Sequence, residues 1–192
     1  MAAKRNFDSE EVLDRAMRTF WTHGYKGTSL EDLSRATGLR KGSLHNAFGN
    51  KEDLFLLALE RYAKLFDDRF EDALDDPDPY RAIARFLEIV IERMSKPSNP
   101  RGCLSAYACT EWEDLPPKAA AKVSQALLEM EERLTRVIER GQQQGKINSK
   151  QDARSLARFF MATIRGMATL HKVTGDVDMI TEVANCAIAV LS

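Results

Sequence analysis

Apolar residues recur every three or four positions along almost the whole chain, which is the period of an amphipathic α-helix. No segment alternates apolar and polar residues as a half-buried strand does. The pattern therefore predicts an all-α protein of nine helices, of which three are short and N-terminal. The first ends at residue 23, and the others cover 29–36, 41–47, 51–74, 79–94, 103–113, 117–141, 149–172 and 178–191.

Residues that begin and end helices support these boundaries. Ser29 and Asp32 have the spacing of a capping box, and Gly38 is free to adopt a positive φ after the second helix. Pro79 suits the first position of the fifth helix. The expected helix over 51–74 has an inner face made of Leu54, Ala58, Tyr62, Leu65 or Phe66, Phe70 and Leu74.

The composition is that of an ordinary globular protein, with 44% hydrophobic and 30% charged residues among 192. No apolar run approaches the roughly 20 residues that span a bilayer, and the first residues lack a signal peptide's apolar core. We therefore expect a cytoplasmic protein with no membrane partner. Three cysteines at irregular spacing fit neither a disulfide framework nor a zinc site, and we expect no metal and no cofactor.

Charge is distributed unevenly. Residues 1–51 hold nine Lys and Arg against six Asp and Glu, whereas the whole chain has a net charge of −1. A basic N-terminal part on an acidic body fits the binding of a polyanion at one end only.

Residues 28–48 read TSLEDLSRATGLRKGSLHNAF, the order short helix, glycine-containing turn, short helix. This is the arrangement of a helix-turn-helix, whose second helix enters the DNA major groove. An expected small core comprises Leu30, Leu33, Ala36, Leu39, Leu44 and Phe48. The outward residues are then Thr28, Arg40, Lys41, Gly42, Ser43, His45 and Asn46. The alternative is a helical hairpin with a solvated polar face.

The stretch AMRTFWTHGYKGTSLEDLSRATGLRKGSLHNAFGNKEDLFLLAL resembles the N-terminal domain of TetR-family transcriptional repressors. The shared features are the aromatic pair before Gly-Tyr-x-Gly-Thr-Ser, the Ala-x-x-x-Gly-Leu turn, Lys-Gly-Ser-Leu and Phe-Gly-x-Lys-Glu. The resemblance implies a homodimer that binds a palindromic DNA operator and is released by a small-molecule or electrophilic inducer. It also implies a DNA-binding domain over 1–50 and a sensing and dimerisation domain over 51–192.

Family roles extend to the matching positions of this chain. Thr28 and Ser29 resemble phosphate contacts at the start of the second helix. Lys51 resembles a backbone anchor at a helix N-terminus, where the helix dipole also favours a phosphate. The recognition-helix face corresponds to Lys41, Gly42, Ser43, His45 and Asn46. His45 departs from the family, which usually has Tyr there.

Beyond residue 75 the resemblance implies mainly a helical body with a ligand cavity and a dimer interface on the last two helices. Amphipathic patterns agree with the interface, because alanine-rich faces can pair closely about a two-fold axis. The interface residues expected are Leu156, Phe160, Ile164, Ile180, Val183, Ala184, Ala187, Ile188 and Leu191. The alternative is that these faces are buried within one chain. The expected cavity wall is Phe86, Tyr107, Trp112, Met130, Phe159 and Met167, although residues of this kind are more often plain core than ligand wall.

Cys103 follows Arg101-Gly102 at the expected start of a helix, where a helix N-terminus and a cation both favour a thiolate. A Gly-Cys here, with 166–172 (GMATLHK), resembles the branch of the family that responds to electrophiles and oxidants, and Lys172 becomes a candidate partner of the thiol. The alternative is that Cys103 only fills space. Cys109 and Cys186 are expected to be packing residues.

The sequence leaves other function classes open. One is a thiol-dependent enzyme that pairs Cys103 with His171 on a helical bundle. No phosphate loop, nucleophile elbow or metal-ligand spacing supports an enzyme, which we do not expect. Two further alternatives are a protein-interaction module and a transcriptional activator with the same fold.

Overall fold

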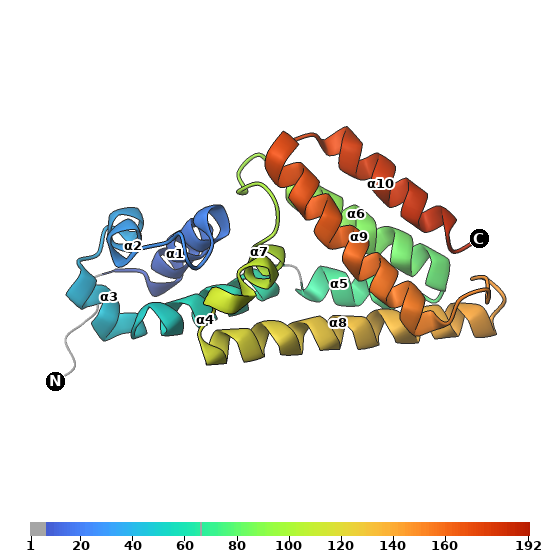
Figure 1. The fold of residues 1–192 in the computed structure, drawn as a ribbon, viewed down its shortest axis with the longest axis horizontal. Helices are drawn as coiled ribbons and strands as arrows, with labels where there is room; N and C mark the ends of the chain where they lie inside the picture. Colours follow the sequence, from blue (N-terminus) through green and yellow to red (C-terminus); the bar gives the residue numbers. More distant parts are fainter. Residues whose placement is uncertain (1–6, 66) are drawn as a thin grey trace.

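The computed structural model describes residues 7–65 and 67–192, and within them the chain is all-helical (Figure 1). The prediction of the fold class is confirmed. The helices are α1 (Ser9–His23), α2 (Leu30–Thr37), α3 (Lys41–Phe48), α4 (Lys51–Lys64), α5 (Asp67–Leu74), α6 (Pro79–Ser95), α7 (Leu104–Thr110), α8 (Pro117–Gln143), α9 (Ala153–Thr174) and α10 (Val177–Ala189), with a 3-10 turn at Trp112–Asp114.

The predicted helix boundaries depend on local hydrogen bonds that the structure contains. Ser29 and Asp32 form the complete capping box at the start of α2, which ends at Gly38 with a φ of 75°. Asp78 caps α6 by accepting from two backbone N–H groups, and Pro79 occupies the first turn. These three expectations are confirmed.

The single helix expected over 51–74 is wrong, because the chain breaks between α4 and α5. Leu65 caps α4 and is 40% exposed, rather than lying on an inner face; Phe66 lies outside the described residues. The consecutive carboxylates Asp67 and Asp68 occupy the first turn of α5, a position that the helix dipole favours. The break lets α4 pack on α1 while α5 packs on α6, so the described part has ten α-helices rather than nine.

Helices α1, α2 and α3 cluster at one end of the molecule, and α4 leads from them into the body (Figure 1). The ring of Phe55 on α4 meets that of Phe20 on α1 edge to face, with centroids 5.0 Å apart. Further along α4, Tyr62 meets Trp21 at 4.8 Å. Because α4 contributes to both parts, the domain boundary at residue 50 stays a prediction.

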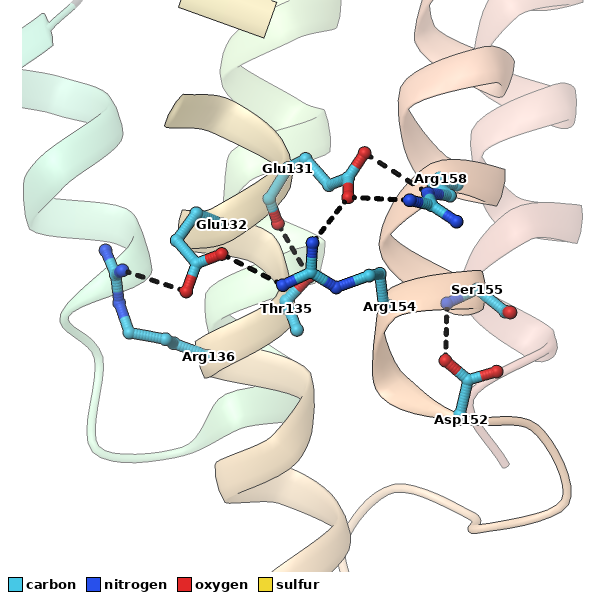
Figure 2. A network of polar contacts seen from close by, with 8 residues as sticks. All are labelled: Glu131, Glu132, Thr135, Arg136, Asp152, Arg154, Ser155 and Arg158. Carbon is cyan, nitrogen blue, oxygen red and sulfur yellow. Dashed lines mark hydrogen bonds and ion pairs between the residues drawn. The ribbon is translucent and has the colours of Figure 1, made fainter. Parts of the chain in front are cut away.

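The body is built on α8, the long helix along the lower edge of Figure 1, with α9 and α10 covering α6. A cluster of ion pairs joins α8 to α9 (Figure 2). The carboxylate of Glu131 accepts from Arg154 at 3.0 Å and from Arg158 at 3.2 Å, while Glu132 accepts from Arg154 at 3.1 Å. The cluster fixes two helices that both line the cavity described below.

None of the helices in residues 7–65 and 67–192 combines the length and the apolar character that crossing a bilayer requires. The same residues contain no group of three or more His, Cys, Asp or Glu side chains placed to hold a metal ion.

Candidate DNA-binding face and ligand cavity

Helix α3 presents one polar face to solvent. Leu44 is buried and anchors the helix on the small N-terminal core. The residues predicted to face outward on and before α3 are exposed, namely Arg40, Lys41, Gly42, Ser43, His45 and Asn46. No atom of residues 7–65 or 67–192 outside this turn of the helix lies within 4 Å of the place where a Cβ on Gly42 would stand, so a nucleic-acid backbone can approach closely there.

Two expectations about α2 are wrong. Thr28 does not face outward: its side chain is buried and its hydroxyl donates to the Gly24 carbonyl at 2.6 Å. Leu30 does not belong to the core, since it is 45% exposed at the start of α2. Ser29 is exposed as expected, although its hydroxyl is engaged in the capping box.

Lys41 is paired across the two helices of the motif. Its ammonium lies 2.7 Å from a carboxylate oxygen of Glu31 on α2, and both side chains are more than half exposed. The hydrogen bond and charge of Lys41 lower the pKa of the Glu31 carboxyl. An exposed pair of this kind contributes little to stability, so Lys41 can exchange it for a DNA contact at small cost.

Lys51 is the first residue of α4, as the resemblance implied. Its ammonium lies over the ring of Tyr25, 4.2 Å from the ring centroid, in a cation–π contact. Partial burial lowers the pKa of Lys51, and the charge of Glu111 opposes that effect. Tyr25 thus fixes the Lys51 side chain at the start of α4.

A cavity of about 480 Å³ lies in the body between α4, α5, α6, α7, α8 and α9. This volume is within the usual range for small-molecule sites. Its apolar wall includes Leu59, Phe70, Phe86, Val90, Val123, Leu127, Met130, Met161 and Ile164. Of the predicted wall residues, Phe86 and Met130 therefore line it, and so does Cys103, the predicted sensor.

The remaining predicted wall residues lie elsewhere. Met167 is fully buried outside the cavity lining, and Tyr107 is half-buried with its ring against the Lys172 ammonium, 4.7 Å from the centroid. Trp112 and Phe159 do not face inward at all, because they are 45% and 41% exposed. Helical periodicity identified apolar faces but could not say which neighbour each face meets.

Cys103 is the N-cap of α7 and is only 5% exposed, so its thiol is reached through the cavity that it lines. The Tyr62 hydroxyl donates to its sulfur at 3.2 Å, and the Ser105 hydroxyl lies 3.1 Å away. Burial alone would raise the pKa of the Cys103 thiol. The charge of Arg93 and the bonds from Ser105 and Tyr62 outweigh burial and lower the pKa to about 7.

The cation that acts on this thiol is not one of those expected from the sequence. Lys172 donates to the Thr22 carbonyl at 2.9 Å, and the Arg101 guanidinium lies against Gly175. Arg93, buried on α6 and hydrogen-bonded to the thiol, takes that role and was missed. The signal was present, since Arg93 falls three residues after Val90 on an otherwise apolar face.

Of the other two cysteines, Cys109 has the packing role expected for it and Cys186 does not. Cys109 is half-buried against the core and also lines the cavity, about 1.7 helical turns from Cys103 along α7 and its cap. Cys186 is exposed on α10.

Polar contacts join the body to α1 and to the turn that precedes α2, among them Arg18 donating to the Ser98 carbonyl at 2.6 Å. The Glu111 carboxylate accepts from the Tyr25 backbone N–H at 2.6 Å. The Lys172 ammonium donates to the Thr22 carbonyl, and Asp114 pairs with Lys26 at 2.9 Å. Cys103 is the N-cap of α7 and Glu111 its C-cap, so this helix runs from the cavity to the turn after α1.

The faces expected to form the dimer interface are mostly buried within the protomer. Leu156, Phe160, Ile180, Ala184, Ala187 and Leu191 are all inaccessible, and Ile164, Val183 and Ile188 pack partly against the same core. The expectation that these residues contact a partner is therefore wrong for the buried six. The opposite face of α9 is exposed and apolar or small, with Phe159, Ala162, Gly166, Leu170 and Val173 at helical spacing.

Comparison with known proteins agrees with this architecture. The family described as "Tetracyclin repressor-like, C-terminal domain" matches residues 79–187, more than half of the chain. The family described as "Bacterial regulatory proteins, tetR family" matches residues 12–58, which include α2 and α3. The protein is a helix-turn-helix transcriptional regulator. It belongs to the TetR family.

Similar proteins include the HTH-type transcriptional repressor ComR of Escherichia coli K12, which is 29% identical over 180 residues, 93% of this chain and 86% of ComR. YezE of Bacillus subtilis, an HTH-type transcriptional regulator, is 27% identical over the whole of both chains. A cysteine mutant of the TetR family regulator CifR, solved with a 26-bp operator DNA, superposes with a TM-score of 0.88 at 29% identity over the full length of both chains. Reduced NemR of Escherichia coli shares the fold, with a TM-score of 0.81 at 17% identity.

Proposed function

We propose that this protein is a transcriptional repressor that binds a palindromic operator as a homodimer, with α3 of each subunit in the major groove. The exposed polar face of α3, held by the buried Leu44, carries the proposal. The operator complex of CifR and the repressor ComR support it, as relatives of similar length. Lys41, Ser43, His45 and Asn46 read base edges or adjoining phosphates, while Ser29 and Lys51 contact the backbone.

The second subunit covers the exposed face of α9. Phe159, Leu170 and Val173 are unusually large apolar side chains to leave in water, and Gly166 between them permits close approach of another helix. Two copies of this face related by a two-fold axis would bury them and hold the two α3 helices about one DNA turn, roughly 34–36 Å, apart.

Cys103 is the sensor that releases the operator. Its thiol lies on a ligand-sized cavity and has a lowered pKa of about 7, so a large fraction is thiolate at neutral pH. The thiolate adds to an electrophilic carbon to form a C–S bond, and for an activated alkene the adjoining carbon takes a proton from water. With a peroxide, it attacks one oxygen to give a sulfenic acid and release hydroxide.

Modification of the Cys103 thiol enlarges the side chain at the start of α7, and the other end of α7 contacts the turn after α1. The added group needs space beside Tyr62 and Ser105, and α7 is only seven residues long. A shift of α7 moves Glu111, and with it Tyr25 and the Lys51 that rests on its ring. A coupling of about 1–3 kcal/mol, roughly 5–150-fold in operator affinity, is typical of such systems.

The test uses a protein whose only cysteine is Cys103, made with Cys109→Ser and Cys186→Ser, and the same protein with Cys103→Ser added. Operator binding is measured by gel shift before and after treatment with N-ethylmaleimide, and the modified site is identified by mass spectrometry. Release of operator from the first protein alone supports the proposal. Equal behaviour of the two proteins makes Cys103 a packing residue and overturns the sensor role.

The geometry favours this regulator over the thiol-dependent enzyme considered from the sequence. His171 accepts a hydrogen bond on Nδ1 from the Gly102 backbone N–H at 3.2 Å, so that nitrogen is committed to the loop before α7. A general base for Cys103 would need its lone pair directed at the thiol. The partners of the sulfur are instead Tyr62, Ser105 and Arg93, none of which is a base at neutral pH.

A further inference from the structure

The buried charge on the cavity wall is positive. Three guanidinium groups line the cavity from separate helices. Arg93 on α6 is buried, Arg165 on α9 is half-buried, and Arg133 on α8 pairs with Glu71 at 2.7 Å. The carboxylates among the described lining residues, Glu60, Asp67 and Glu129, are exposed or half-exposed, and Glu60 pairs with Lys122 at 3.2 Å. None of the acidic side chains in the described lining is buried.

Arg165 has a donor that lacks an acceptor. Its Nη1 donates to the Met161 carbonyl of its own helix at 3.2 Å, whereas its Nε is buried and has no hydrogen-bond partner among the described residues. Buried donors in folded proteins are nearly always satisfied, and an unsatisfied one on a ligand cavity indicates that the ligand supplies the acceptor. The acceptor that a guanidinium binds best is a carboxylate or a similar oxyanion.

Arg93 adds a second reason for an anion. It is 6% exposed and hydrogen-bonded to the Cys103 sulfur. Its guanidinium also lies over the Tyr62 ring, 5.5 Å from the centroid, so a fixed positive charge stands beside the thiol at the cavity wall. An anion near Arg93 would be stabilised by this charge and would at the same time oppose the thiolate.

We propose that the cavity binds an amphipathic anion, an apolar chain or ring system that ends in a single carboxylate. The carboxylate pairs with Arg165 and lies within the field of Arg93, while the apolar body lies along Phe70, Phe86 and Met130. Binding of this ligand class to the cavity does not depend on the proposed function. Only the effect of the ligand on operator binding rests on the proposed function.

The test compares decanoate with decanol, which has the same chain length but no charge, by isothermal titration. The proteins are the wild type, Arg165→Met and Arg165→Lys, with Arg136→Met as a matched control on the exposed surface of α8, where Arg136 pairs with Glu132. We expect decanoate to bind the wild type and Arg136→Met alike and to lose roughly tenfold in Arg165→Met, with a smaller loss in Arg165→Lys. Decanol should bind weakly to all four proteins. Equal affinity for decanoate and decanol, or an unchanged affinity of Arg165→Met, overturns the proposal.

A second measurement places the head group. The rate at which N-ethylmaleimide modifies Cys103 is followed against pH with decanoate or with decanol present. Decanoate should shift the apparent pKa of the thiol upward, because its charge near Arg93 opposes the thiolate, and decanol should leave it unchanged. An unchanged apparent pKa under saturating decanoate overturns the placement beside Arg93.

The two proposals fail separately. If decanoate binds in an Arg165-dependent manner while N-ethylmaleimide leaves the operator bound, the ligand class stands and the covalent sensor is wrong. If N-ethylmaleimide releases the operator while decanoate binding does not depend on Arg165, the sensor stands and the ligand class is wrong.

Discussion

The carboxylate of Glu111 accepts a 2.6 Å hydrogen bond from the backbone N–H of Tyr25, which lies 86 positions earlier in the chain. The carboxylate occupies space that a Cβ on Gly24 would need, and Gly24 has a φ of 76° that also favours glycine. Tyr25 in turn carries Lys51 on its ring. One side chain of the body therefore positions the turn after α1 and, through it, a candidate phosphate contact.

Replacing Glu111 by Ala should weaken operator binding by roughly tenfold, because a charged hydrogen bond to a backbone N–H is lost and Tyr25 loses its fixed position. Fluorescence anisotropy with labelled operator measures the change. Glu113→Ala, which removes an exposed carboxylate two residues away, is the matched control and should behave as the wild type. Equal affinity of both variants and the wild type would limit Glu111 to a local structural role.

Lys51→Ala should weaken binding to operator and to random DNA by a similar factor and reduce the salt slope by about one unit, because a phosphate contact releases about one counterion. The measurement is a titration at several salt concentrations. A loss confined to the operator would place Lys51 against a base.

Lys41 should behave differently from Lys51. Lys41 is the candidate reader of guanine O6 and N7. Lys41→Ala should therefore change the preferred operator at one position and cost about 1–3 kcal/mol of binding free energy there. Glu31→Gln should tighten binding several-fold, because it frees Lys41 from its 2.7 Å partner and removes a negative charge near the phosphates. Selection from random DNA with Lys41→Ala tests the first statement; an unchanged preferred site would make Lys41 a backbone contact.

Val173→Asp should dissociate the homodimer and abolish operator binding, since Val173 is 77% exposed on the α9 face and tolerates the change within the protomer. Leu128→Asp is the control, because Leu128 is also exposed and apolar but belongs to α8. Light scattering gives the oligomeric state. A dimeric Val173→Asp protein would move the interface to another surface.

Acid should destabilise the protein through His171. Burial, and secondarily the charge of Arg101, lower the pKa of this imidazole in the folded state, whereas the unfolded value is about 6.5. Below about pH 6.5 the unfolded chain therefore binds more protons than the folded one, and stability falls as pH falls toward the lowered pKa. Protonated His171 also cannot accept from Gly102.

Urea unfolding at pH 7.5 and pH 5.5 measures this effect in the wild type and in His171→Gln. The wild type should lose more stability between the two pH values than His171→Gln, whose amide does not titrate. The same loss in both proteins would assign the acid sensitivity to other groups.

Several features of the protein followed from short-range sequence signals. Caps such as Ser29–Asp32, the positive φ of Gly38 and the period of apolar positions are local, since each depends on residues within one or two helical turns. The same locality explains why the helix-turn-helix could be located, with Leu44 inside and Lys41, His45 and Asn46 outside.

What only the tertiary structure decided is which faces meet. Leu156 and Phe160 have the same period as Phe159 and Val173, yet the first two are buried in the protomer and the last two are exposed. Arg93 approaches Cys103 because α6 and α7 both line one cavity. Lys172, the partner of the thiol expected from the sequence, instead donates to the Thr22 carbonyl. A helical period specifies which face of a helix is apolar, but not which other helix covers that face, because this depends on how helices distant in sequence pack. The hydrogen bond between Glu111 and Tyr25 likewise forms only once these distant helices have packed together.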